Sequence, residues 1–125
     1  MARKIQAIVI DDDGLMRRLV ASILTELDCG VVGIDKDGAA AVELYRENKP
    51  DLVFLDINMP DVDGLVALRR IFKFDPDAHV VMLTGNADTA VAESCISAGA
   101  KDYLHKDAGP EVLRQGLERA VRQRR

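Results

Sequence analysis

Carboxylates stand directly after two apolar runs of this sequence. Asp56 follows residues 52–55, four apolar residues that include a β-branched and an aromatic side chain. Such a run is typical of a central strand that is covered on both faces. Residues 11–13, three consecutive aspartates, follow the apolar run 5–10 in the same way. In open α/β sheets, ligands bind at the edge where the strands have their carboxyl ends, so these carboxylates are candidates for chemistry.

A hydroxyl and an amine stand near the ends of two further runs. Thr84 follows residues 80–83, and Lys106 comes shortly after residues 101–104. Three carboxylates at one spot repel one another, and a divalent cation is the simplest relief. Oxygen ligands that leave room for water suit Mg²⁺ better than zinc. With a lysine and a hydroxyl opposite the metal, Asp56 could attack phosphorus and form an aspartyl phosphate.

The elements that must position these residues alternate along the chain. Apolar spacing predicts strands over residues 5–10, 31–34, 52–55, 80–83 and 101–104. It predicts helices over residues 15–27, 38–48, 65–72 and 88–97, and a last helix that begins at Pro110. This alternation predicts an α/β fold: a flavodoxin-like (βα)5, doubly wound parallel five-stranded sheet with strand order 2-1-3-4-5.

Two local features are predicted within this pattern. Asp37 is expected to be the N-cap of the second helix. In the loop after the third strand, Asp61 and Asp63 are expected to serve as turn acids, and Gly64 is expected to adopt a positive φ.

Composition narrows the class of protein. The chain has 125 residues, which fits one domain over residues 1–125, with 48% hydrophobic and 30% charged residues. Its net charge of -4 implies no general attraction to nucleic acid or membranes. The only cysteines, Cys29 and Cys95, lack paired spacing and are expected to be reduced thiols of a cytoplasmic protein. The N-terminal apolar run is too short for a signal peptide.

Taken together, the motifs resemble the response regulator receiver domain of two-component signalling over essentially the whole chain. They are Asp11-Asp12, Asp56 with Met59-Pro60 and Asp63-Gly64, Leu83-Thr84, Ala98-Gly99-Ala100, and Tyr103 with Lys106. One departure is Asp107, because many members have a proline after the lysine, with that peptide bond cis. We expect a trans bond here, because a non-proline cis bond costs about 2.5–4 kcal/mol.

The resemblance implies a role for each site residue. Asp56 would be the phosphoacceptor, and Lys106 would pair with it or with the phosphoryl oxygens. Thr84 would hydrogen-bond the phosphoryl group, and Tyr103 would be an aromatic ring that switches rotamer. Mg²⁺ would be held by a set of oxygen ligands: Asp12, Asp56, the backbone carbonyl of Asn58, and Asp11 through a coordinated water.

The resemblance also implies partners. A sensor histidine kinase or histidine phosphotransfer protein would supply the phosphoryl group, docking on apolar surface around Leu15, Met16 and Leu19. The domain would catalyse only its own phosphorylation and slow autodephosphorylation. The helix 88–97, the strand 101–104 and the last helix would form the face that an output domain or a second copy reads. Direct binding of nucleic acid or a membrane is not expected.

Three other functions are open to the same sequence. In a haloacid-dehalogenase-type phosphatase, Asp11 would be the nucleophile and Asp13 the acid/base, but that family needs a further pair of acids and gives Asp56 no role. In the receiver interpretation, Asp13 is instead a neighbour that tunes the charge of the site. A flavodoxin-like electron carrier needs a hydroxyl- and amide-rich loop where this chain is acidic. A phosphorylation-independent interaction module would not need the acids, threonine and lysine that are present.

Overall fold

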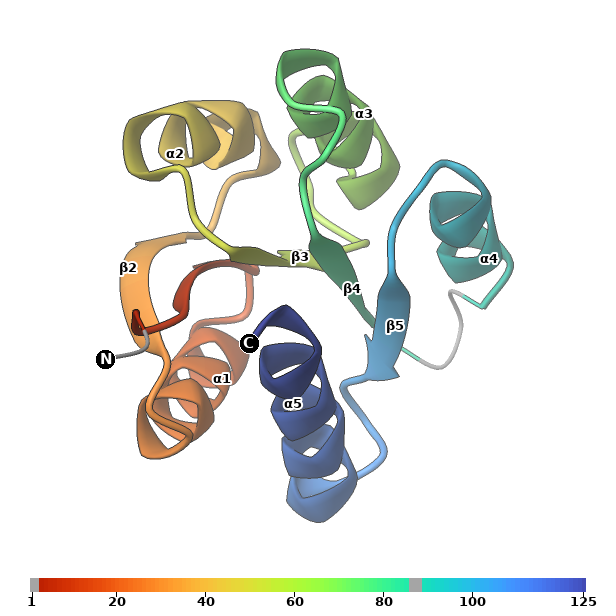
Figure 1. The fold of residues 1–125 in the computed structure, drawn as a ribbon. Coiled ribbons are helices and arrows are strands. Elements are labelled where there is room, and N and C mark those ends of the chain that lie inside the picture. The colour runs from red at the N-terminus through yellow and green to blue at the C-terminus, as the bar shows by residue number, and fades with distance from the viewer. Residues whose placement is uncertain (1–2, 86–88) are drawn as a thin grey trace.

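A parallel sheet forms the centre of the molecule (Figure 1). The computed structural model describes residues 3–85 and 89–125, and in these ranges the sheet has five strands. They are β1 (Gln6–Ile10), β2 (Gly30–Asp35), β3 (Leu52–Asp56), β4 (Val80–Thr84) and β5 (Asp102–His105). Neighbouring strands pair in parallel in the order β2-β1-β3-β4-β5. The predicted flavodoxin-like order is therefore confirmed.

Helices connect the strands and cover both faces of the sheet. They are α1 (Gly14–Glu26), a 3₁₀ turn η1 (Gly38–Ala40), α2 (Ala41–Asn48), α3 (Gly64–Phe74), α4 (Thr89–Ser97) and α5 (Pro110–Arg124). Helices α1 and α5 cover one face, and α2, α3 and α4 cover the other (Figure 1). Asp88, where the fourth helix was predicted to begin, lies outside the described residues. No described helix is both long enough and apolar enough to cross a bilayer.

Successive residues of each strand face opposite layers of the core. In β3, Val53 and Leu55 belong to the layer beneath α2, α3 and α4. Leu52 and Phe54 belong to the layer beneath α1 and α5. Side chains of a strand alternate between the two faces, and every residue of β3 and β4 is buried. Burial on both faces explains why these strands are continuous apolar runs in the sequence.

The prediction that Asp37 caps a helix over residues 38–48 is wrong. A 3₁₀ turn precedes α2, and the Asp37 side chain makes no capping hydrogen bond. Tertiary packing explains the difference, because Gly38 is buried against the loop that follows β3. A Cβ atom at Gly38 would lie 2.9 Å from Cε of Met59. The chain therefore follows the shape of that loop before it enters the regular helix.

The prediction of a positive φ at Gly64 is also wrong, because the glycines with positive φ in the described chain are Gly99 and Gly109. Gly64 is needed for close packing instead. A Cβ atom there would lie 2.6 Å from Cα of Ile57 and would collide with the carbonyl oxygen of Asp56. Helix α3 thus begins directly against the carboxyl end of β3. Asp63 does serve the turn, since its Oδ1 accepts a hydrogen bond of 2.9 Å from the backbone N–H of Val66 and caps α3.

Candidate functional site

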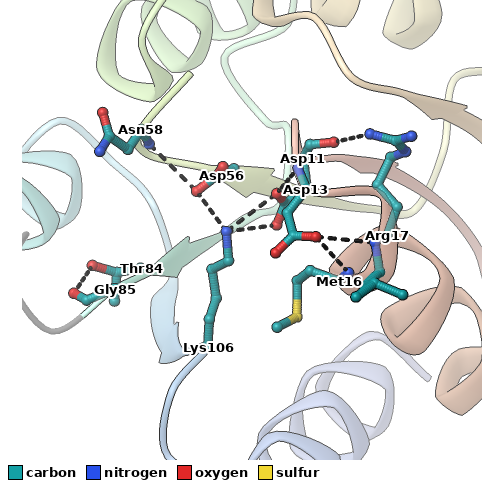
Figure 2. A network of polar contacts seen from close by, with 10 residues as sticks. Asp11, Asp13, Met16, Arg17, Asp56, Asn58, Thr84, Gly85 and Lys106 are labelled. Atoms are coloured by element: carbon teal, nitrogen blue, oxygen red, sulfur yellow. Dashed lines mark hydrogen bonds and ion pairs between the residues drawn. The ribbon is translucent and has the colours of Figure 1, made fainter. Parts of the chain in front are cut away.

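The strand order brings the predicted site residues to one edge of the sheet (Figure 2). Strands β1 and β3 are neighbours, with Ile10 in register with Leu55. Asp11 directly follows Ile10 and Asp56 directly follows Leu55, so the two aspartates lie side by side. Lys106 enters from the end of β5, where its backbone N–H donates to the carbonyl of Thr84 at 2.8 Å. Residues that are up to 95 positions apart in the sequence therefore meet at one point.

The ammonium group of Lys106 lies between two buried carboxylates. Its Nζ is 3.1 Å from Oδ1 and 3.0 Å from Oδ2 of Asp11, and 3.3 Å from Oδ1 of Asp56. The side chain of Asp11 is fully buried, that of Asp56 is 3% exposed, and that of Lys106 is 14% exposed. Burial acts to lower the pKa of Lys106, but the hydrogen bond and charge of Asp11, together with Asp56, outweigh burial and raise it. Lys106 is therefore charged at neutral pH.

Asp56 is the carboxylate that the surroundings perturb most. Burial, followed by the negative charge of Asp11, raises the pKa of Asp56 to about 8, and the charge of Lys106 opposes this rise. Its Oδ1 accepts the backbone N–H of Asn58 at 3.3 Å. Its Oδ2 is buried and has no hydrogen-bond partner among the described residues. Oδ1 of Asp56 thus has a hydrogen-bond donor, whereas Oδ2 is shielded from water and has no hydrogen-bond partner in the described chain.

The carboxylates fit a divalent cation. Asp11, Asp12 and Asp56 each offer an oxygen, and these three atoms lie within 4.8 Å of one another. Asp11 and Asp56 are buried and Asp12 is exposed, so the cluster opens to solvent on one side. A cation held by these three groups would offset their negative charge. Hard oxygen donors beside open solvent suit Mg²⁺, which keeps part of its water shell.

In the described part of the chain, the side chains of Thr84 and Tyr103 are not among the groups that Nζ of Lys106 contacts. Thr84 is fully buried, and its hydroxyl donates to the carbonyl of Gly85 at 3.0 Å, apart from Asp56 in Figure 2. Tyr103 is half-buried and packs against the core layer of α2, α3 and α4. The Lys106–Asp107 bond is trans, as expected, since the described chain contains no cis peptide bond.

Two contacts at the site were not predicted (Figure 2). Asp13, expected only to tune charge, is the N-cap of α1, where its Oδ1 accepts from the backbone N–H groups of Leu15 at 3.0 Å and Met16 at 3.4 Å. Arg17 donates from Nη1 to the backbone carbonyl of Asp11 at 2.6 Å. The position of Asp13 just before a helix was a usable signal for the cap. Nothing in the sequence identified Arg17, because the contact depends on how α1 meets β1.

The chemistry of this arrangement is that of a phosphoryl acceptor. A buried carboxylate oxygen of Asp56 has no partner in the described chain, Lys106 lies beside the same carboxylate, and the acidic residues that could hold a cation adjoin both. The arrangement does not favour the phosphatase interpretation, because the carboxylate of Asp13 is engaged in capping α1.

Comparison with known proteins agrees with this geometry. The family model of the response regulator receiver domain matches residues 7–118. The chain is 39% identical over 121 residues to the chemotaxis protein CheY of Bacillus subtilis, covering 97% of this chain and 99% of that protein. It is 34% identical over 114 residues to CheY of Thermotoga maritima, covering 91% of this chain and 95% of that protein.

Solved structures give the same result. The response regulator domain of Thermotoga maritima CheB aligns with a TM-score of 0.87 and 33% identity, over 97% of this chain and 96% of that one. The CheX–CheY–BeF₃–Mg²⁺ complex of Borrelia burgdorferi aligns with a TM-score of 0.84 and 26% identity, over 95% of this chain and 87% of that one.

Proposed function

Because this chain belongs to the family of response regulator receiver domains of two-component signalling, we propose that Asp56 is its phosphoacceptor. The proposal rests on the different surroundings of the two Asp56 oxygens. Oδ1 is held by Lys106 and by the N–H of Asn58, whereas Oδ2 is buried without a partner. A nucleophile needs such an oxygen, because a lone pair that is already hydrogen-bonded is less available for attack.

The donor we propose is a phosphohistidine of a sensor histidine kinase or histidine phosphotransfer protein. An oxygen of Asp56 forms a P–O bond while the P–N bond of the donor breaks, and the electron pair of that bond leaves with the imidazole. Lys106 remains beside the acceptor and offsets the negative charge that arrives with the phosphoryl group. The domain acts on itself only, and it later loses the phosphoryl group slowly to water.

Mg²⁺ is the cofactor that we propose for this site. Asp11, Asp12 and Asp56 would hold it, with the backbone carbonyl of Asn58 as a further ligand and Asp11 acting through a water. When bound, the ion supplies positive charge to the phosphoryl oxygens. The chain's own residues orient the acceptor: Lys106 and the Asn58 N–H fix Oδ1, and Arg17 fixes the backbone of Asp11.

The signal would leave through Thr84 and Tyr103. A phosphoryl group on Asp56 is a new acceptor for the Thr84 hydroxyl, which is now bonded to Gly85. When that hydroxyl turns, the packing beside Tyr103 changes, and with it the face formed by α4, β5 and α5. We propose that an output domain or a second copy of the chain reads this face. We take residues 1–125 as one receiver unit, in the cytoplasm, where Cys29 and Cys95, both buried and unpaired, remain reduced.

Phosphate-affinity electrophoresis tests the acceptor. The parent protein, incubated with acetyl phosphate and Mg²⁺, should give one shifted band, and Asp56→Asn should give none. Asp11→Asn should weaken the band without abolishing the dependence on Asp56. A shift that persists in Asp56→Asn and disappears in Asp11→Asn would support the phosphatase interpretation instead.

A further inference from the structure

Three residues of the site region share one face of the sheet. In the pairing of β4 with β5, Thr84 is in register with His105, and Met82 is in register with Tyr103. Residues two apart on a strand point to the same face, and partners across a parallel pair do so as well. Met82 belongs to the core layer of α2, α3 and α4, and Tyr103 packs against that layer. Thr84 and His105 therefore lie on this face, and His105 stands next to both Thr84 and Tyr103.

His105 is a polar residue in a position that an aliphatic side chain could fill. Its ring meets the Tyr103 ring edge to face, with the centroids 5.6 Å apart and the planes at 82°. Its Nδ1 atom is buried and has no hydrogen-bond partner in the described part of the chain. A buried polar atom without a partner is costly because it has lost its hydrogen bonds to water, and such groups in native structures call for an explanation. Use of the nitrogen in a second state of the protein would be such an explanation.

The Thr84 hydroxyl can be the partner of His105 Nδ1 in that second state. A hydroxyl has one hydrogen to donate and two lone pairs that accept. In this structure the hydrogen is donated to the carbonyl of Gly85. Neighbouring strands lie about 4.8 Å apart. Because Oγ1 of Thr84 and Nδ1 of His105 are one and two bonds from their Cβ atoms, side-chain rotation alone can bring them together.

Building on the proposed function, we propose that His105 is a positioning residue that couples Thr84 to Tyr103. When the Thr84 hydroxyl donates its hydrogen to a phosphoryl oxygen on Asp56, Nδ1–H of His105 donates to a lone pair of the same hydroxyl. This bond holds Thr84 in its turned position. It also turns the imidazole ring, and the Tyr103 ring must follow because the two rings are in contact. Nδ1 thus holds Thr84, and the ring transmits the movement to Tyr103.

Two substitutions separate these tasks. His105→Phe keeps an aromatic ring beside Tyr103 and removes Nδ1. His105→Asn keeps a polar side-chain atom close to the place of Nδ1 and removes the ring that contacts Tyr103. The matched control is His79→Phe, because His79 also has a buried nitrogen without a partner in the described chain, Nε2, but precedes β4 at the opposite end of the strand.

The experiment uses fluorine NMR of the full chain labelled with 3-fluorotyrosine. The chain has two tyrosines, so Tyr45→Phe assigns the Tyr103 signal. Beryllium trifluoride with Mg²⁺ is the phosphoryl probe, and the backbone amide of Asn58 reports whether the probe has bound beside Asp56. A second readout is the ¹⁵N shift of the His105 Nδ1 atom, which should move toward that of a hydrogen-bonded N–H when the probe binds.

The expected result is that the probe shifts both the Asn58 amide and Tyr103 in the parent and in His79→Phe. In His105→Phe and in His105→Asn the Asn58 amide should still shift, and the Tyr103 shift should be lost, because phenylalanine lacks Nδ1 and asparagine lacks the ring. A full Tyr103 response in His105→Phe would overturn the coupling. A full Tyr103 response in His105→Asn would also overturn it, since Tyr103 would then respond without the ring that is proposed to move it. If the parent shows no shift at Asn58, the proposed function itself fails, and the inference fails with it.

Discussion

The single positive charge of Lys106 lies beside two buried carboxyl groups, so the site has fewer positive than negative partners. Taking charges out of water costs several kcal/mol per ion, and mutual attraction repays the cost only when the charges balance. Here the two carboxylates of Asp11 and Asp56 face one ammonium group. Burial, followed by the negative charge of Asp11, keeps the pKa of Asp56 high, and a second cation at the site would favour the ionised form of Asp56. The cluster is therefore better explained by function than by stability.

Asp51 shows the opposite arrangement at the other end of β3. Its two carboxylate oxygens accept hydrogen bonds from Arg3 at 2.6 and 2.9 Å, and one of them also accepts the backbone N–H of Gln6 at 2.8 Å. The hydrogen bond from Arg3 is the main cause that lowers the pKa of Asp51. This carboxylate is fully satisfied and distant from the site, so we assign it to folding.

We predict that Asp51→Asn lowers the free energy of unfolding at pH 7 by about 1 kcal/mol. A carboxyl group whose pKa is lowered by folding contributes stability above its unfolded pKa, roughly 3.9, and that contribution is lost as the pH falls through the folded pKa. The difference between parent and variant should therefore shrink below about pH 4. Urea unfolding followed by circular dichroism from pH 3 to 7 measures it. The exposed Asp28, 3.6 Å from Lys4, is the control, and Asp28→Asn should change little. A gap between parent and Asp51→Asn that is constant with pH would refute the role of ionisation.

At the scale of elements, α1 carries its cap on a residue of the acidic run. Asp13→Ala should lower the free energy of unfolding by about 1 kcal/mol, because two N–H groups at the start of α1 lose their acceptor. Asp13→Ser should recover most of this loss, since serine also caps helices. Both variants should still be labelled by acetyl phosphate at close to the parent rate. Labelling abolished in both, with folding intact, would mean that Asp13 takes part in proton transfer.

The junction of β3 with α3 depends on a glycine at position 64. Gly64→Ala should destabilise the protein by about 1–3 kcal/mol, because the added methyl group displaces the backbone of Asp56 and Ile57. It should also slow labelling by acetyl phosphate, because the acceptor moves. Gly14→Ala is the matched control: the nearest atoms to its new Cβ are ends of arginine side chains, at 3.4 and 3.8 Å. Thermal unfolding of both variants tests the contrast, and equal melting temperatures would contradict it.

The elements were predicted well from the sequence, and their junctions less well. A strand buried on both faces, such as β3, is visible as a local apolar run, and Asp56 at its end is visible too. The turn at Gly38, the packing of Gly64 and the contact of Arg17 with Asp11 all depend on a second segment distant in the sequence. Local patterns carry no information about such a segment. Asp37 was therefore wrongly predicted to cap a helix: it has the residue type of a cap, but it precedes a 3₁₀ turn and its side chain makes no capping hydrogen bond.

At the scale of the whole molecule, topology places the site and an exposed apolar residue together. The order β2-β1-β3-β4-β5 sets Asp11, Asp56 and Lys106 at one edge, and α1 begins at the same edge. Leu15, in the first turn of α1, is 75% exposed, whereas Met16 and Leu19 are half-buried and pack against the core. The surface predicted for the phosphodonor is thus narrower than expected, and Leu15 is its most accessible member.

Leu15→Lys should slow phosphoryl transfer from a cognate histidine kinase by about tenfold, equivalent to 1.4 kcal/mol of lost contact. Labelling by acetyl phosphate should be unchanged, because a small donor needs no docking surface. Val32→Lys, which replaces an exposed aliphatic residue of β2, should leave both rates unchanged. The rates are measured with radiolabelled phosphate on the kinase. Equal slowing with both donors would place the defect in the site, and no slowing with either would exclude Leu15 from docking.

We propose that the phosphoryl group resides on Asp56, and chemical trapping can locate it. Borohydride reduces an aspartyl phosphate to homoserine, which leaves a permanent mark at the acceptor. Trypsin cuts after Lys4 and Arg17, which releases residues 5–17 as one peptide. It also cuts after Arg46 and Arg69, and because it does not cut between Lys49 and Pro50, residues 47–69 form a second peptide. Asp11 and Asp56 therefore fall in different peptides. After treatment with acetyl phosphate, Mg²⁺ and borohydride, fragmentation should find homoserine at position 56. Homoserine at position 11, with position 56 unmodified, would show that Asp56 is not the phosphoacceptor.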